Sequence, residues 1–180
     1  MNTPNKLTLL RVIMIPLFIF FYLYDFIPAS NIIATVLFVA AFFTDWLDGY
    51  LARKTNQVTD FGKIMDPLAD KVLVAAAMVC MTGEGIVNPW ITIAVLAREF
   101  AVSGIRIAAA AEGNVVAASI WGKLKTMWQF IAITVALIFK ALGLAQLQII
   151  VDILMWINLA LTVLSGIDYI VKNKKYLSYK

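Results

Sequence analysis

Two pairs of aspartates lie at the edges of apolar stretches, where a carboxylate is costly to bury. Asp45 and Asp48 occur in the segment DWLDGYLA, and Asp66 and Asp70 occur in MDPLAD. In a helix, positions three or four apart share a face, so each pair presents two carboxylates in one direction. Oxygen ligands without histidine or cysteine suit Mg²⁺, Mn²⁺ or Ca²⁺. The aspartates therefore predict a divalent-metal site, and their number suits two ions.

The helix face that carries Asp45 and Asp48 is otherwise made of small residues. Gly49 and Ala52 follow Asp45 at intervals of four and seven residues, and they leave space beside the carboxylates. Four negative charges this close would repel one another or take up protons unless cations lay between them. A two-metal site in a helical bundle suits phosphoryl transfer. The pattern therefore favours an enzyme that acts on a phosphorylated substrate.

Simpler explanations exist for each aspartate taken alone. Asp66 precedes Pro67, so it could cap the start of a helix whose first residue is proline. The other pair could form ion pairs with Arg53 or Lys71. These explanations leave the small-residue face without a purpose, and ionisable residues within a membrane usually mark a functional site.

The composition is that of a membrane protein. Of 180 residues, 62% are apolar and 14% are charged, whereas a soluble domain has about 45–50% apolar and about 25% charged residues. Most of the apolar segments approach the roughly 20 residues that a helix needs to cross a bilayer, and they lack the alternation of strands. We predict an all-α, polytopic membrane protein with one domain over residues 1–180 and a bundle of six transmembrane helices, at roughly 8–27, 31–51, 67–82, 89–111, 124–144 and 147–171.

Lysine and arginine predict the orientation of this bundle. They gather at both termini, in the connection over residues 53–65 and before the fifth segment, while the alternate connections contain almost none. By the positive-inside rule, both termini and the 53–65 connection are cytoplasmic. We therefore expect a multi-pass protein of the cell membrane, with its site facing the cytoplasm. The short basic connections do not suit nucleic-acid binding, and the single cysteine, Cys80, excludes an intrachain disulfide.

The stretch from Asp45 to Asp70 resembles the signature of the CDP-alcohol phosphotransferase family, Asp-x2-Asp-Gly-x2-Ala-Arg-x8-Gly-x3-Asp-x3-Asp. All eight fixed positions are met, at Asp45, Asp48, Gly49, Ala52, Arg53, Gly62, Asp66 and Asp70. The resemblance implies six helices, a site near the cytoplasmic face and assembly as a homodimer. It also implies that the phosphatidyl group of CDP-diacylglycerol passes to an alcohol and that CMP is released.

Two further stretches narrow the expected acceptor. The opening NTPNKLTLLRVIMIP and the stretch REFAVSGIRIAAAAEGNVVAASIWGKLKTMWQ, from Arg98, resemble bacterial phosphatidylglycerophosphate synthases within this family. The acceptor implied is glycerol 3-phosphate, and the product is phosphatidylglycerol phosphate. The alternatives within the same chemistry are phosphatidylglycerol, inositol phosphate or serine as acceptor.

The resemblance also assigns roles to residues. Asp45, Asp48, Asp66 and Asp70 would hold Mg²⁺ or Mn²⁺, and Asp70 is the candidate general base for the attacking hydroxyl. The lipid substrate would be bound by Asn5, Thr8, Asp48, Gly49, Ala52, Arg53 and Gly62.

Basic residues near the same membrane face are candidates for the acceptor's phosphate. They are Arg11, Arg98, Arg106, Lys123 and Lys125. Arg98 and Arg106 lie within about 80° of each other around a helix, so they share roughly one face. The alternatives are that Arg98 neutralises an acid such as Glu99 or Asp152 and that the lysines anchor a helix at the interface.

A divalent-cation transporter is the alternative from another functional class, since it would also need acids within the membrane. A transporter requires polar groups along a path through the bilayer. Here the acidic pairs lie on one side, which favours the enzyme.

Overall fold

The fold is known from a computed structural model. It describes residues 3–24, 27–55, 60–114, 116 and 119–174, and the side chains of 9–24, 27–44, 68–114, 116 and 119–174. These residues form helices and turns and contain no strand, which confirms the all-α prediction. The elements are α1 (Thr3–Leu23), α2 (Ser30–Thr55), α3 (Asp60–Gly83), α4 (Pro89–Ala111), α5 (Ile120–Ala141), the short 3-10 turn η1 (Ala145–Leu147) and α6 (Gln148–Lys172).

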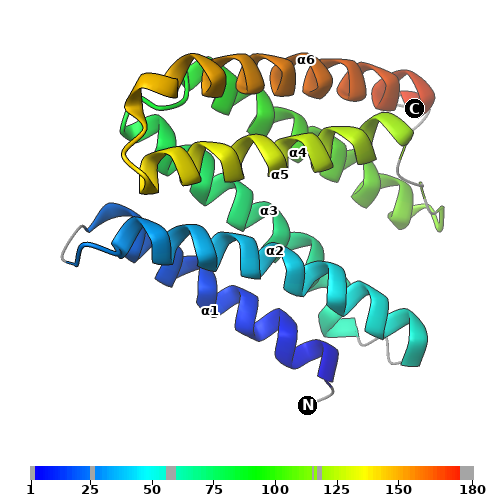
Figure 1. Ribbon diagram of the computed structural model, residues 1–180. Helices are drawn as coiled ribbons and strands as arrows, with labels where there is room; N and C mark the ends of the chain where they lie inside the picture. Colours follow the sequence, from blue (N-terminus) through cyan, green and yellow to red (C-terminus); the bar gives the residue numbers. More distant parts are fainter. Residues whose placement is uncertain (1–2, 25–26, 56–59, 115, 117–118, 175–180) are drawn as a thin grey trace.

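The helices form two groups joined by α3 (Figure 1). The α1–α2 pair makes one group, the helices α4, α5 and α6 make the other, and α3 crosses from the first to the second. Both chain ends lie at the same end of the bundle, together with the α2–α3 and α4–α5 connections. We call this the terminal end, and the opposite end, where the other three connections lie, the turn end.

The surface of the bundle is apolar where a soluble protein would be polar. Two segments, Ile120–Ala141 and Ala145–Lys172, are long and apolar enough to cross a membrane, and Leu9–Leu23 and Ser30–Thr44 are shorter apolar helices. Along α6 the exposed large side chains include Ile149, Ile153, Trp156, Val163, Leu164 and Ile167. A continuous apolar face of this kind is rare on soluble monomers and suits contact with lipid.

The helices around the aspartates are longer than the apolar segments predicted. The 53–65 connection was expected to be irregular, but α2 continues to Thr55 and α3 begins at Asp60. Hydropathy marks where the apolar segment ends, whereas alanine, arginine and lysine continue a helix into the polar region. Because Asp66 and Pro67 lie inside α3, Asp66 does not cap the start of a helix, and that simpler explanation is wrong.

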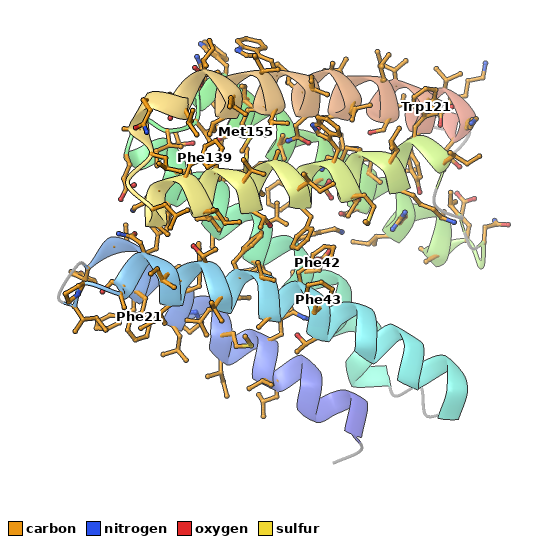
Figure 2. The ribbon with its side chains drawn as sticks, in the orientation of Figure 1. Phe21, Phe42, Phe43, Trp121, Phe139 and Met155 are labelled. Atoms are coloured by element: carbon orange, nitrogen blue, oxygen red, sulfur yellow. The ribbon has the colours of Figure 1, made fainter. Side chains whose placement is uncertain are left out.

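The two groups of helices meet through aromatic side chains. Phe130 of α5 stacks on Phe42 of α2 with ring centroids 3.6 Å apart and an interplanar angle of 15°. Phe38, one turn earlier on α2, lies 6.0 Å from Phe130 at 14°. Figure 2 shows Phe42 pointing from α2 toward α5. Stacked pairs contribute about 0.5–1.5 kcal/mol each beyond the burial of their area, so Phe130 is a main contact between the groups.

Replacing Phe130 with alanine is expected to lower the free energy of unfolding by at least about 1 kcal/mol, because both stacked pairs are lost. The midpoint of thermal unfolding in detergent measures the change. Phe100→Ala on α4 is the matched control, since Phe100 is 68% exposed. Equal losses in the two variants would contradict the importance of this contact.

Candidate active site

The backbone of α2 and α3 supports the predicted grouping of the aspartates. Asp45, Asp48, Gly49 and Ala52 all lie within α2, and Asp66 and Asp70 lie within α3, so each pair does share one face of a continuous helix. The two helices are in contact, and both pairs lie toward the terminal end (Figure 1). The α2–α3 segment therefore carries four carboxylates to one end of the bundle.

Most side chains assigned to the metal and to the lipid substrate lie outside the described side chains. These are Asn5, Thr8, Asp45, Asp48, Gly49, Ala52, Arg53, Gly62 and Asp66. The described part of the chain contains no cluster of three or more acidic or metal-binding side chains. The convergence of the four carboxylates around a metal thus stays a prediction, to which the backbone contributes the shared faces.

Asp70 is the signature aspartate whose side chain is described, and it lines a pocket. The walls come from four helices: Asp70, Lys71 and Val74 of α3, Phe38 and Phe42 of α2, Glu99 of α4, and Lys125, Thr126, Gln129 and Phe130 of α5. Its volume is about 30 Å³, which accommodates water-sized groups. A carboxylate of the signature thus lines one small pocket together with Lys71 of α3 and Lys125 of α5.

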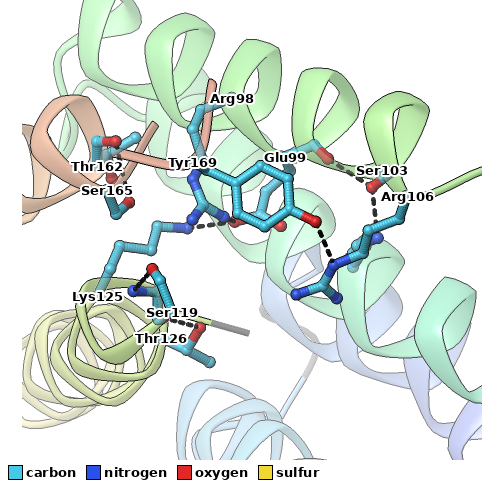
Figure 3. A network of polar contacts seen from close by, with 12 residues as sticks. Arg98, Glu99, Ser103, Arg106, Ser119, Lys125, Thr126, Thr162, Ser165 and Tyr169 are labelled. Carbon is cyan, nitrogen blue, oxygen red and sulfur yellow. Dashed lines mark hydrogen bonds and ion pairs between the residues drawn. The ribbon is translucent and has the colours of Figure 1, made fainter. Parts of the chain in front are cut away.

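Lys125 is a buried lysine at this pocket. It is 1% exposed, and its Nζ lies 2.5 Å from Oε1 of Glu99. Arg98 donates to the same oxygen from NH1 at 3.1 Å. Figure 3 shows the two cations meeting at the Glu99 carboxylate. One acidic side chain therefore holds a basic group from α4 and another from α5.

Lys71, the residue after Asp70, is held by the same turn of α4. Its Nζ donates to Oγ of Ser103 at 2.5 Å, and Ser103 donates to the backbone carbonyl of Glu99, also at 2.5 Å. The Glu99–Ser103 turn is thus hydrogen-bonded to lysines on both sides of the pocket.

Glycines make room for the Arg98 side chain. A Cβ atom at Gly166 of α6 would lie 3.2 Å from Cγ of Arg98, and one at Gly122 of α5 would lie 3.6 Å from its NH2. Ser119 caps the start of α5 by accepting from the backbone N–H of Gly122. Arg98 therefore lies between the start of α5 and the end of α6, beside the pocket. Its ion pair is with Glu99, one of the two acids expected from the sequence, and Asp152 bonds instead with Gln148.

The remaining predicted phosphate ligands are placed elsewhere. Arg106 is exposed, and its Nε donates to the hydroxyl of Tyr169 at 3.3 Å, with the guanidinium 5.7 Å from that ring's centre. Lys123 is exposed in the first turn of α5.

Arg11 is fully buried between α1 and α2, where its Nε donates to the carbonyl of Ala41, one turn before Asp45. Among the five predicted cations, the structure brings Arg98 and Lys125 together.

A buried polar seam between α4, α5 and α6 was not anticipated. Buried positions on α6 recur every three or four residues, and they change from Val151 and Met155 near the turn end to Asn158, Thr162 and Ser165 near the terminal end. Buried Lys125 and Gln129 lie on the same half of α5. The signal was present in the sequence, because polar residues interrupt the apolar α6 segment at heptad-like intervals.

Comparisons with known proteins show what the sequence resembles over most of its length. A family model described as CDP-alcohol phosphatidyltransferase matches residues 1–164. A relative from Bacillus subtilis, named CDP-diacylglycerol–glycerol-3-phosphate 3-phosphatidyltransferase, is 41% identical and covers 96% of this chain and 95% of its own. Relatives of the same name from Haemophilus influenzae and Rickettsia bellii are 42% and 38% identical. They cover 94% and 97% of this chain, and 91% and 97% of their own.

Proposed function

Because the chain belongs to the CDP-alcohol phosphatidyltransferase family, we propose that it transfers the phosphatidyl group of CDP-diacylglycerol to glycerol 3-phosphate. The products are phosphatidylglycerol phosphate and CMP, and the reaction is a step of phospholipid synthesis. The names of the relatives give both substrates. The observation that carries the proposal is the pocket in which Asp70 of the signature lies with Lys71 and Lys125.

The reaction replaces one P–O bond by another. The acceptor's hydroxyl oxygen bonds to the phosphorus that carries the diacylglycerol, and the bond from that phosphorus to the CMP oxygen breaks. The hydroxyl proton passes to the Asp70 carboxylate, a role in which a positioned base accelerates a reaction by about 10²–10⁴-fold. CMP leaves with the negative charge of the broken bond.

The carboxylates fit a divalent metal by their chemistry and by their helices. An all-oxygen donor set suits Mg²⁺ or Mn²⁺, and the faces of α2 and α3 that carry it lie at one end of the bundle. We assign Asp45, Asp48, Asp66 and Asp70 as ligands of two ions. When bound, the ions would neutralise the diphosphate and polarise the phosphorus under attack. Around them, Asn5, Thr8, Gly49, Ala52, Arg53 and Gly62 would bind the lipid substrate.

Lys125 and Arg98 are the cations best placed for the acceptor's phosphate. An ammonium group has three N–H donors, and Glu99 takes one from Lys125, which leaves two for phosphate oxygens. Charge-assisted hydrogen bonds of this kind are the strong ones in proteins. Arg11, Arg106 and Lys123 do not line the described pocket. Arg106 and Lys123 are exposed and would attract the anion as it approaches, whereas Arg11 is buried elsewhere.

The location follows from the same features. The lipid substrate keeps its acyl chains in the bilayer, so a site at the terminal end belongs just inside the membrane surface. The bias of lysine and arginine toward that end supports a site on the cytoplasmic side, where a soluble acceptor can enter. Six membrane crossings and assembly as a homodimer complete the proposal and rest on the hydropathy pattern and the family resemblance.

The apolar half of the seam argues against a cation transporter. Near the turn end the buried residues of α5 and α6 include Ile133, Leu137, Val151 and Met155. A cation path would need oxygen ligands or water at this level. Along α6 the buried polar residues Asn158, Thr162 and Ser165 lie in the half nearer the terminal end, as expected for an enzyme site open on one side.

The acceptor is tested with purified protein and CDP-diacylglycerol in the presence of glycerol 3-phosphate, phosphatidylglycerol, inositol phosphate or serine. We expect CMP release with glycerol 3-phosphate, provided that Mg²⁺ or Mn²⁺ is present, and none after chelation. A faster reaction with another acceptor would reassign the substrate. CMP release that persists without a divalent metal would contradict the proposed metal site.

Asp70→Asn is expected to lower kcat by at least about 100-fold, because an amide cannot accept the proton. Binding of CDP-diacylglycerol, and of metal by the other three carboxylates, should be retained when measured by calorimetry. Asp45→Asn and Asp66→Asn are the comparison, since there metal binding itself should weaken. Turnover at the wild-type rate in Asp70→Asn would show that Asp70 is not the base.

Lys125→Met is expected to raise the KM for glycerol 3-phosphate by about tenfold or more, since one charged hydrogen bond is worth about 1.5–3 kcal/mol. The KM for CDP-diacylglycerol should hardly change. Lys172→Met is the matched control: Lys172 also forms an ion pair, with Asp168, but its side chain is 63% exposed. Equal increases in both KM values would mean that Lys125 supports the fold rather than the acceptor.

A further inference from the structure

Glu99 is a largely buried carboxylate that the family signature does not include. Its side chain is 18% exposed and lines the same pocket as Asp70. Its Oε1 accepts from Nζ of Lys125 at 2.5 Å and from NH1 of Arg98 at 3.1 Å. Both partners are the cations assigned above to the acceptor's phosphate, so the role of Glu99 depends on that assignment.

Stability alone does not account for this ion pair. Removing two charges from water costs about as much as their attraction returns, and well-packed apolar residues often stabilise a buried position as well or better. A lysine side chain is also flexible, with a point charge at the end of four carbons. Without a partner on α4, the ammonium of Lys125 would turn along its own helix toward the polar membrane surface. The carboxylate prevents this by fixing Nζ at the wall of the pocket.

The same residue acts on the other side of the pocket through its backbone. The carbonyl of Glu99 accepts from Ser103, whose Oγ in turn accepts from Nζ of Lys71. Two cations and one carboxylate in the Arg98–Glu99–Lys125 cluster leave one net positive charge, so the cluster still attracts an anion. The carboxylate itself would repel a phosphate, which excludes a direct contact.

We infer that Glu99 is a positioning residue for the acceptor: it holds Lys125 and Arg98 where they bind the phosphate of glycerol 3-phosphate and does not touch that phosphate. The inference deepens the proposed function and rests on it. It assigns to α4 the task of fixing the anion site, while α2 and α3 carry the signature carboxylates.

The bundle contains a matched control for this ion pair. At the turn end, Glu84, the residue after the end of α3, pairs with Lys140 of α5, with Oε1 and Nζ also 2.5 Å apart. The hydroxyl of Tyr22 donates to the second oxygen of Glu84 at 2.9 Å. This cluster joins helices with the same chemistry, but it lies at the end opposite the signature. Glu84→Gln therefore measures what the loss of such a pair does to stability alone.

The test is a double-mutant cycle in the full-length enzyme. Glu99→Gln should raise the KM for glycerol 3-phosphate by about tenfold and leave the KM for CDP-diacylglycerol within about twofold. In a Lys125→Met background, the same change should raise this KM by clearly less than tenfold, because the part of the effect that acts through Lys125 is already lost and only the contact with Arg98 remains. Glu84→Gln should lower the midpoint of thermal unfolding and leave both KM values unchanged.

Several outcomes would overturn the inference. A full tenfold increase from Glu99→Gln in the Lys125→Met background would show that Glu99 acts independently of Lys125. Equal increases in both KM values would make it a fold residue. An unchanged KM for glycerol 3-phosphate in Lys125→Met would instead contradict the assignment of Lys125 to the phosphate site, on which the inference rests.

A second variant keeps the inference testable if Glu99→Gln does not fold. Glu99→Asp keeps the charge and shortens the side chain by one carbon, which draws the carboxylate away from Nζ of Lys125. With thermal stability near that of the wild type, this variant should raise the KM for glycerol 3-phosphate several-fold. A folded Glu99→Asp enzyme with an unchanged KM would exclude a positioning role.

Discussion

A lysine inside an apolar bundle needs a partner, and this requirement organises the terminal half of the molecule. The low dielectric around Lys125 makes its charge costly unless a carboxylate lies nearby, and Glu99 supplies it from the neighbouring helix. The relative positions of α4 and α5 are thereby fixed at the level of the pocket. Arg98 donates to the same oxygen, and Gly166 of α6 leaves room for its side chain, since a Cβ atom there would lie 3.2 Å from Cγ of Arg98. Glu99, Arg98 and the glycine beside Arg98 are thus all linked to the need to pair the charge of Lys125.

The division of the bundle follows from the two chemical tasks. The α2–α3 segment brings carboxylates, which suit cations, and α4 with α5 brings basic groups, which suit anions. The aromatic contacts of Phe130 with α2 join these two groups, so that Asp70 and Lys125 line one pocket. The buried residues of α6 become apolar toward the turn end, so its buried polar side chains lie in the terminal half of the bundle. A reaction between a lipid anchored in the bilayer and a soluble anion needs this one-sided arrangement.

The fold class and the shared faces of the aspartates could be predicted from the sequence because both depend on intervals along one helix. The orientation of one helix toward another could not be predicted from the sequence. Lys123 and Lys125 lie about 200° apart around α5, so at most one can face the pocket, and the apolar pattern near the helix start does not say which. The ends of α2 and α3 could not be predicted either, because hydropathy indicates where the apolar segment ends and not where the backbone hydrogen bonds of the helix end. Glu99 was visible beforehand only as one of two acids near Arg98, since ion pairs between helices leave no periodic signal.

Along the chain Glu99 precedes Lys125, so the ribosome synthesises the carboxylate-bearing helix α4 before the lysine-bearing helix α5. A lone lysine at the centre of a membrane helix costs about 2.5–3.5 kcal/mol during insertion, and Lys125 in the second turn of α5 meets part of that cost. With α4 in place before α5, the carboxylate of Glu99 would be available to the ammonium group of Lys125 and would offset part of that cost.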